Sequence, residues 1–396
     1  MAPTTEASAT VPETPESMDT PYHALSRILT FPNLDQHQYW HHLAPMFGKM
    51  LADAKYSIHR QYEYLLLYAR IMIPKFGPFR LPGTEEGVFR NILGSVGPYE
   101  VSNNLQKSGK IVRIGLEPTS YMACTGHDPF NRRALHSTLA ELKEIGSGGD
   151  NVDLELHHRL INELTITDRE QQLIPAEDIA KMPWHTQVLV GMDLYHTSGF
   201  VVKEYFYPSV KASVTGQTVE NLCFSAIRKV DPQGHFDAAA RIVESYLQRQ
   251  PKLETFMFAC DLVDLAKTRF KLYVMELDVS FRKIEEHFTL GGALRDEETM
   301  VGLQMIREIW DGLEIPEGQR PVPTRSTGPA KPGDPLIHPI GLYYQLNPGD
   351  PVPKVQFYFP LVGIPDAKIA DVLVAFFERH GMTEHAKTYK ENLQSY

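Results

Sequence analysis

The hydrophobic pattern of the chain contains three stretches in which apolar and polar residues alternate and the polar series ends in tyrosine. They occupy residues 200–208, 268–274 and 355–360. Because successive side chains of a β-strand point to opposite sides, each stretch would place its polar residues on a single face. In chain order, those faces carry Lys203, Tyr205 and Tyr207; Arg269, Lys271 and Tyr273; and Gln356 and Tyr358.

This pattern has two interpretations. In the first, each stretch is a half-buried antiparallel strand whose polar face meets water. Such strands usually mix threonine, serine, glutamate and lysine, whereas these three repeat tyrosine, which is costly to expose. In the second interpretation, the three faces converge on a common interior. They would then form a chamber with cations at one level and tyrosine rings beside them, a site suited to an anion and a developing carbocation.

The periodicity of the whole chain predicts pairs of helices that alternate with pairs of strands. Four helix-helix-strand-strand rounds are followed by a fifth helix pair. Eight antiparallel strands with the helices outside predict an α+β fold, a closed or nearly closed antiparallel barrel of αα-ββ repeats, since closure removes sheet edges. The predicted strands are 99–105, 111–117, 186–194, 199–207, 254–263, 269–275, 340–346 and 355–361; the predicted helices are two within 38–73, then 128–144, one from 153, 219–229, 236–248, 280–289, 297–313, 366–380 and 383–395.

Composition narrows the class of protein. Of the 396 residues, 42% are hydrophobic and 22% are charged, which is typical of a globular protein. The net charge of -10 argues against a nucleic-acid partner. The first residues are rich in Ala, Thr, Pro, Glu and Ser without an apolar segment, so we expect a disordered tail over 1–25 and a single domain over 26–396.

No apolar run is long enough to span a bilayer. The cysteines Cys124, Cys223 and Cys260 are odd in number and far apart, so the sequence indicates neither a disulfide framework nor a zinc site, and we expect a cytoplasmic protein. Histidine pairs such as His157-His158 fall on predicted helices, where a solvated face is the expected environment.

The sequence lacks the phosphate-binding glycine loops, the H-E-x-x-H zinc motif and the D-D-x-x-D motif. A diphosphate bound without clustered aspartates would be neutralised directly by Lys203, Arg269 and Lys271 rather than through Mg²⁺. Glu117 shares a strand face with Arg113. It is either a general base whose pKa burial could adjust, or a strand-end residue that caps the turn at 118–120.

Five motifs in order resemble the fungal aromatic prenyltransferases of the dimethylallyltryptophan synthase type. The resemblance covers about residues 40–395 and rests on residues 117–118 (Glu-Pro), 128–131 (Asp-Pro-Phe-Asn), 203–208 (Lys-Glu-Tyr-Phe-Tyr-Pro), 268–273 (Thr-Arg-Phe-Lys-Leu-Tyr) and 356–360 (Gln-Phe-Tyr-Phe-Pro).

The resemblance implies the αββα prenyltransferase barrel and transfer of a dimethylallyl group from dimethylallyl diphosphate to an aromatic ring, with no cofactor and no obligatory metal. It also implies residue roles. Glu117 would take the acceptor's proton; Lys203, Arg269, Lys271 and Gln356 would bind diphosphate; and Tyr205, Tyr207, Tyr273 and Tyr358 would shield the allyl cation.

Several alternatives stay open at this stage. The acceptor is an indole or tryptophan derivative or a phenolic polyketide, because the segment around Glu117 reads Leu-Glu-Pro-Thr-Ser where indole-acting members usually have Phe-Glu-Pro. Members usually continue into two more strands, so we expect a barrel that lacks the last strand pair and has low activity. A homodimer, and a barrel that binds an aromatic metabolite without turnover, are further possibilities.

Overall fold

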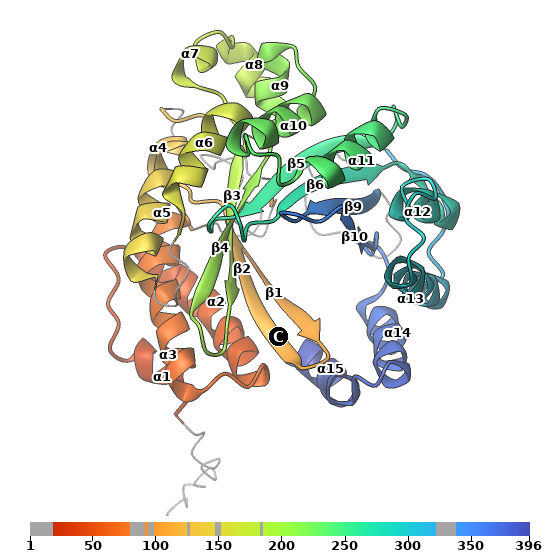
Figure 1. Cartoon of the computed structure of the whole chain (residues 1–396). Coiled ribbons are helices and arrows are strands. Elements are labelled where there is room, and N and C mark those ends of the chain that lie inside the picture. The colour runs from red at the N-terminus through yellow and green to blue at the C-terminus, as the bar shows by residue number, and fades with distance from the viewer. Residues whose placement is uncertain are drawn as a thin grey trace, which may run out of the picture.

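The computed structural model describes residues 19–79, 92–93, 99–124, 127–146, 152–182, 185–321 and 338–396. Eight strands form one antiparallel sheet in which each strand pairs with the next one along the chain (Figure 1). The predicted strand pairs are therefore confirmed. Their bounds are β1 (Tyr99–Gln106), β2 (Gly109–Leu116), β3 (Val188–Leu194), β4 (Phe200–Phe206), β5 (Glu254–Asp261), β6 (Phe270–Glu276), β9 (Ile340–Leu346) and β10 (Lys354–Tyr358).

Helices surround the curled sheet on its outer side, as Figure 1 shows. The predicted helix pairs are present, and several short helices occur between them. The bounds are α1 (Pro21–Ser26), α2 (Leu34–Asp53), α3 (Ile58–Leu67), α4 (Tyr121–Cys124), α5 (Arg133–Ile145), α6 (Leu154–Leu164), α7 (Asp168–Gln171), α8 (Ala176–Lys181), α9 (Ser209–Thr215), α10 (Val219–Val230), α11 (Asp237–Leu247), α12 (Phe281–Phe288), α13 (Glu297–Leu313), α14 (Asp366–Arg379) and α15 (Thr383–Ser395). Beyond these, Tyr68–Met72 and Ile73–Lys75 prolong α3, and β7 (Asp278–Val279) pairs with β8 (Gly318–Gln319).

The outer face of the sheet is apolar and forms the main core with the helices. Phe206, Phe258 and Phe270 are wholly buried there, and their rings lie 5.4–6.3 Å apart from strand to strand. Burying a side chain of this size stabilises the fold by roughly 1.5–3 kcal/mol. The helices therefore pack against the outer face of the sheet, and the side chains of the opposite face line the interior.

The sheet is curled but not closed by strand pairing. In the ladder that the structure describes, β1 and β10 are the two edges and do not pair with each other. At the β1 edge, Nε2 of His385 in α15 donates a hydrogen bond to the carbonyl oxygen of Gln106 at 2.7 Å. In Figure 1, α14 and α15 lie between the two edges. Because carbonyl oxygen can only accept, the Nε2 of His385 carries the proton. The expectation that the last strand pair is absent from the fold stays a prediction.

Two predicted boundaries were wrong. The tail was expected to reach residue 25, but α1 begins at Pro21 and buries Leu25 in the core; residues 1–18 lie outside the described part. The helix predicted from Asp128 begins at Arg133, because the Asp128 carboxylate accepts hydrogen bonds from the backbone N–H groups of Arg132 and Arg133 and holds residues 128–131 in a turn.

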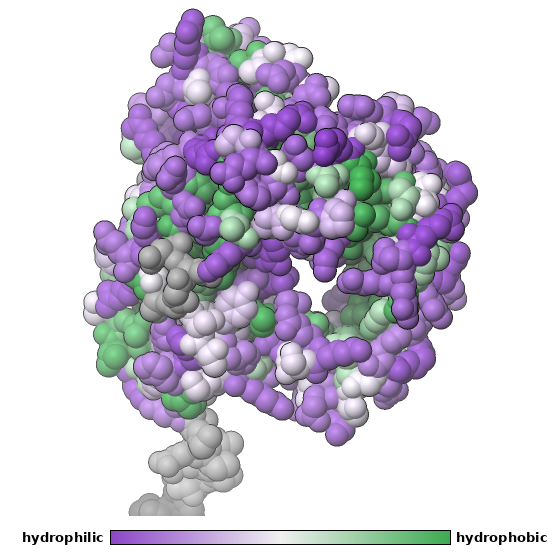
Figure 2. Space-filling model, viewed as in Figure 1, coloured by the Kyte–Doolittle hydropathy of each residue, from purple (hydrophilic) through white to green (hydrophobic). Residues whose placement is uncertain are grey.

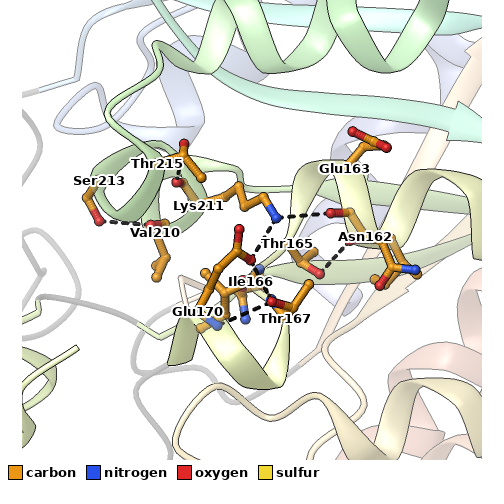
Figure 3. Close-up of polar contacts among 12 residues, drawn as sticks. Asn162, Glu163, Thr165, Ile166, Thr167, Glu170, Val210, Lys211, Ser213 and Thr215 are labelled. Carbon is orange, nitrogen blue, oxygen red and sulfur yellow. Dashed lines mark hydrogen bonds and ion pairs between the residues drawn. The ribbon is translucent and has the colours of Figure 1, made fainter. Parts of the chain in front are cut away.

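A buried lysine joins the short helices that the sequence did not predict. The Nζ of Lys211 in α9 donates to Glu170 Oε2 at 2.7 Å and to the carbonyl oxygen of Asn162 at 3.0 Å (Figure 3). Thr167 and Glu170 form a capping box at the start of α7. These contacts fix α7 and α9 against the end of α6.

No helix in the described ranges is both long enough and apolar enough to cross a membrane.

Candidate active site

The strand register brings the polar faces predicted from the sequence to the same side of the sheet. Lys203 of β4 lies opposite Asp261 of β5, and Lys271 of β6 lies opposite Ala259 of β5. Residues 259 and 261 share a face, so both lysines point to the interior. Further along the sheet, Tyr273 lies opposite Tyr343, and Tyr343 lies opposite Gln356. A single interior therefore receives all three polar series, and Figure 2 shows an opening that passes through the molecule between the β1–β2 side and α13.

Two carboxylates organise the cations of this interior. Asp193 of β3 binds Lys203 through Oδ2 at 2.5 Å and lies 3.0 Å from the Nε of Arg113 through Oδ1. Asp261 binds the Nε of Arg269 through Oδ2 at 2.6 Å, and its buried Oδ1 has no hydrogen-bond partner within the described part of the chain. Four cations, counting Lys271, face these two carboxylates, and Glu100 of β1 adds a third carboxylate to the same interior, so positive charge is still in excess. An anion with several oxygens would balance this charge.

Lys271 is the member of this group without a carboxylate of its own among the described residues. It is 6% exposed, and its Nζ lies 5.3 Å from the centre of the Tyr343 ring. Burial, followed by the positive charge of Lys203, lowers the pKa of Lys271 to about 8. The ammonium group is thus poorly compensated in the free protein, and a bound anion would stabilise its charged form.

Tyrosine rings cover the interior beside the cations. The ring of Tyr273 lies 5.0 Å from that of Tyr343, 6.2 Å from that of Tyr358 and 6.3 Å from that of Tyr205, between ring centres. Tyr207 and Tyr273 belong to an apolar cluster with Leu189, Met257 and Ala259 that is separate from the main core. The interior therefore has an aromatic wall of the kind that stabilises a nearby cation and excludes water.

Two further residues of the predicted set, Gln356 and Tyr358, lie at the margin of the interior. Gln356 is exposed, and its Oε1 accepts a hydrogen bond from the Tyr343 hydroxyl. Tyr358 is 43% exposed on the edge strand β10.

Glu117 lies at the end of β2 and is enclosed rather than open to the interior. It is 2% exposed; its Oε2 accepts a hydrogen bond from Thr186 Oγ1 at 2.6 Å, and Asn131 Nδ2 lies 3.5 Å from its Oε1. Burial raises the pKa of Glu117 to about 8, although both hydrogen bonds act in the opposite direction. At neutral pH this group is mainly a carboxylic acid.

Another carboxylate, Glu100 of β1, lies on the interior face of the sheet, where its side chain is accessible but surrounded by the walls of the interior. It lies opposite Gly115, which lies opposite Gly191, which lies opposite Lys203. A Cβ atom at Gly115 would come within 2.8 Å of Glu100 Cγ, so the glutamate side chain lies across the glycine. Desolvation raises the pKa of Glu100 above its ordinary value.

Gly191 of β3, which lies opposite Gly115, also leaves space for a neighbouring side chain. A Cβ atom at Gly191 would come within 2.8 Å of Tyr205 Cε2. The two glycines thus allow Glu100 and Tyr205 to lean over the sheet between β1 and β4. This leaves a carboxylate and a phenol facing the space beside the cations.

The sequence-based site omitted five residues that the structure brings to this interior: Glu100, Arg113, Asp193, Asp261 and Tyr343. For two of them the sequence contains a local pattern that could have indicated an interior position. Asp193 is the lone charged residue of an otherwise apolar strand, and Tyr343 occupies an alternating position of β9. Glu100 carries no such local signal, because its strand mixes polar residues on both faces.

Comparison with known proteins settles the family. A family model described as tryptophan dimethylallyltransferase matches residues 35–392. The chain belongs to this family. A roquefortine prenyltransferase, roqD of Penicillium rubens, is 53% identical over 98% of this chain and 90% of its own length. The prenyltransferase nanD of Aspergillus nanangensis is 40% identical over 96% of this chain and 88% of its own length.

Solved structures of dimethylallyltryptophan synthase-type prenyltransferases share the fold. AnaPT from Neosartorya fischeri superposes with a TM-score of 0.82 at 28% identity and covers 95% of this chain and 89% of its own. NotF in complex with brevianamide F and DMSPP superposes with a TM-score of 0.81 at 27% identity, with the same coverage. The predicted prenyltransferase barrel of antiparallel strands with outer helices is thereby confirmed.

Proposed function

We propose that this protein transfers a dimethylallyl group from dimethylallyl diphosphate to an indole-bearing acceptor. The observation that carries the proposal is the group of four cations, two of them buried lysines, that outnumber the neighbouring carboxylates next to a tyrosine wall. A binding protein for a neutral aromatic molecule would not need an uncompensated charge of this size. The relatives named prenyltransferases, and the NotF complex with DMSPP, support the same reaction.

The diphosphate is assigned to the cations. Lys203, Arg269 and Lys271 would bind its oxygens, joined by Arg113, while Gln356 would donate from the edge strand through its amide. Departure of diphosphate from the allyl carbon places negative charge on the oxygens that these groups face, so their stabilisation grows as the bond breaks. The cations supply this charge directly, and the step requires no metal ion.

The allyl cation is assigned to the tyrosines. Tyr205, Tyr207 and Tyr273, with Tyr358 at the margin, would stabilise it through their ring faces, by roughly 0.5–2 kcal/mol for each favourably placed ring. They would also exclude water, which otherwise captures the cation.

Proton removal from the acceptor is assigned to Glu100. Glu117 stands as the competing assignment, which the family resemblance implied. A general base must be ionised and able to reach the proton. Glu100 is exposed to the interior, whereas Glu117 is enclosed, hydrogen-bonded and mainly protonated at neutral pH because its pKa is about 8. Replacing each by glutamine separates the two assignments.

The test is incubation of the purified protein with dimethylallyl diphosphate and a panel of acceptors: tryptophan, cyclic dipeptides that contain tryptophan, and phenolic polyketides. We expect a prenylated product from a member of the indole group, detected by mass spectrometry. Glu100→Gln should remove most transfer and leave pyrophosphate affinity within about twofold of the wild-type value, whereas Glu117→Gln should retain transfer.

Other outcomes would redirect the proposal. Loss of transfer in Glu117→Gln alone would return the base to that residue. A product from the polyketides but not the indoles would change the acceptor class. Binding of both substrates without product would favour the non-enzymatic alternative.

We also propose a cytoplasmic protein that forms a homodimer. Cys223 and Cys260 are free and buried, which is compatible with a reducing compartment. Localisation of a tagged full chain and light scattering of the purified protein test these two points, and a monomeric mass would overturn the second.

A further inference from the structure

Three histidines converge on the outer side of the barrel, away from the interior described above. His136 lies on α5, and His157 and His158 lie on α6. Each of the three rings has one nitrogen, Nδ1 or Nε2, in this cluster, and these three nitrogens all lie within 4.8 Å of one another. The ring centres are 4.9–5.8 Å apart. These rings form a cluster whose nitrogens face one another.

The imidazole of His157 is held on its sheet side by the carboxylate of Glu204. His157 is wholly buried, and its Nδ1 lies 2.8 Å from Oε1 of Glu204, which is also wholly buried. A carboxylate oxygen accepts, so Nδ1 carries a proton, and in the neutral imidazole Nε2 keeps its lone pair. That Nε2 points away from the sheet and lies 3.0 Å from Nδ1 of His136. A carboxylate that orients a histidine in this way is the usual second shell of a zinc ligand.

The two outer imidazoles are free to adjust. His136 and His158 are exposed, and in the described part of the chain His158 contacts the other two rings but makes no hydrogen bond. Three imidazoles around a tetrahedral Zn²⁺ hold their nitrogens about 3.3 Å apart, given Zn–N distances of about 2.0–2.1 Å. The separation of His136 and His157 is already close to this value. A side-chain rotation of the exposed His158 would supply the third ligand.

A second Glu–His pair in the protein serves as a comparison, because both nitrogens of its imidazole are used in internal hydrogen bonds. His287 of α12 binds Glu276 of β6 through Nε2 at 3.0 Å, and its Nδ1 lies 2.7 Å from the buried hydroxyl of Tyr246. Both ring nitrogens are thus satisfied inside the protein. At His157 the chain of contacts ends instead on two exposed imidazoles, which are open to solvent and whose ring nitrogens could bind a metal ion.

We propose that His136, His157 and His158 bind a divalent transition metal, Zn²⁺ by preference, with Glu204 as the orienting second-shell residue and the fourth position open to water. Neutral imidazoles favour Zn²⁺ over Mg²⁺ or Ca²⁺. The metal would join α5 and α6 to each other and, through His157 and Glu204, to β4. Its role is structural, because the cluster lies on the opposite side of β4 from Lys203 and Tyr205.

The experiment compares zinc binding to the metal-stripped full chain and to single variants, by isothermal titration with zinc chloride and by dialysis followed by elemental analysis. We expect one Zn²⁺ for each wild-type chain. His136→Ala and His158→Ala alter exposed residues and should each weaken the affinity at least tenfold. His59→Ala, which alters an exposed histidine on α3, is the matched control and should bind as the wild type does.

Two further readouts distinguish a built site from a pair of surface histidines. Co²⁺ should give the wild type the visible absorption of a four-coordinate nitrogen site, and Zn²⁺ should raise its thermal midpoint but not that of the double variant H136A/H158A. His157→Gln keeps an amide that can reach Glu204 and should also lose the metal. Equal zinc affinity in the wild type and the double variant would overturn the proposal, and so would full affinity in a folded His157→Gln.

The metal site and the proposed transfer reaction share no residue. Prenyl transfer that survives EDTA while zinc binding is lost would therefore support both conclusions, and failure of either leaves the other testable by its own assay.

Discussion

Glu117→Gln should change how the stability of the protein depends on pH. The pKa of Glu117 is raised from 4.5 to about 8, mainly by burial. Because the folded-state pKa lies above the unfolded one, the folded protein binds more protons between these two values, and this group's contribution to stability is lost as pH rises through that window. This rise in pKa corresponds to about 5 kcal/mol, at about 1.4 kcal/mol for each pH unit.

Glutamine preserves the shape and the hydrogen bonds of the site but cannot ionise. Its carbonyl oxygen can accept from Asn131 and its amide can donate to the Thr186 hydroxyl, so the variant should fold. We expect the free energy of unfolding of the wild type to fall relative to that of the variant by about 1.4 kcal/mol for each pH unit from about pH 5 to about pH 8. Above about pH 8 the difference between the two proteins should stay constant.

Urea unfolding of both proteins across this range measures the difference, and other titrating groups cancel because both proteins contain them. Glu391→Gln, which alters an exposed carboxylate of α15, is the matched control and should show no such slope. A stability difference between wild type and Glu117→Gln that stays constant from pH 5 to pH 8 would refute the assignment of Glu117 as a buried acid.

Further predictions concern the interior. Inorganic pyrophosphate should bind with uptake of protons and with affinity that falls as pH rises through about 8, because the anion raises the lowered pKa of Lys271; Lys271→Arg should remove this dependence in titration calorimetry. Gly115→Ala should displace Glu100 and reduce kcat at least tenfold while the pyrophosphate Kd changes by less than about twofold. Tyr273→Leu should divert dimethylallyl diphosphate from transfer to hydrolysis, measured as the ratio of alcohol to prenylated acceptor. Transfer should persist in EDTA, and its complete loss would contradict the metal-independent assignment.

Much of the fold could be predicted from the sequence because its signals are local. The period of two in the strands and the helical spacing between them identify the rounds of helices and strands without knowledge of their partners. The same alternation placed Lys203 and Lys271 on one side of the sheet, as their register shows. The roles of these residues stay predictions, since placement on a face does not show what binds there.

The rest depends on tertiary partners that alternation does not specify. His157 was expected to face solvent, yet it is wholly buried, because its side chain points from α6 to the buried carboxylate of Glu204 in β4. Likewise, Glu117 and Glu100 both occupy strand positions that face inward by alternation. Only the surroundings distinguish them: Thr186 and Asn131 enclose the first, and Gly115 leaves room for the second.

The register of β4 shows how the two faces of one strand constrain each other. Phe200, Val201 and Val202 are apolar in succession, so their pattern does not decide which face is inner. Polar contacts decide it: Lys203 binds Asp193 inside, and Glu204 binds His157 outside. A slip by one residue would place the carboxylate among the interior cations and the ammonium group against a buried imidazole. It would reverse the charge that the diphosphate needs and bury two unpaired ions, each at a cost of several kcal/mol. The Glu204–His157 contact, although it lies outside the interior, therefore helps to keep Lys203 within it.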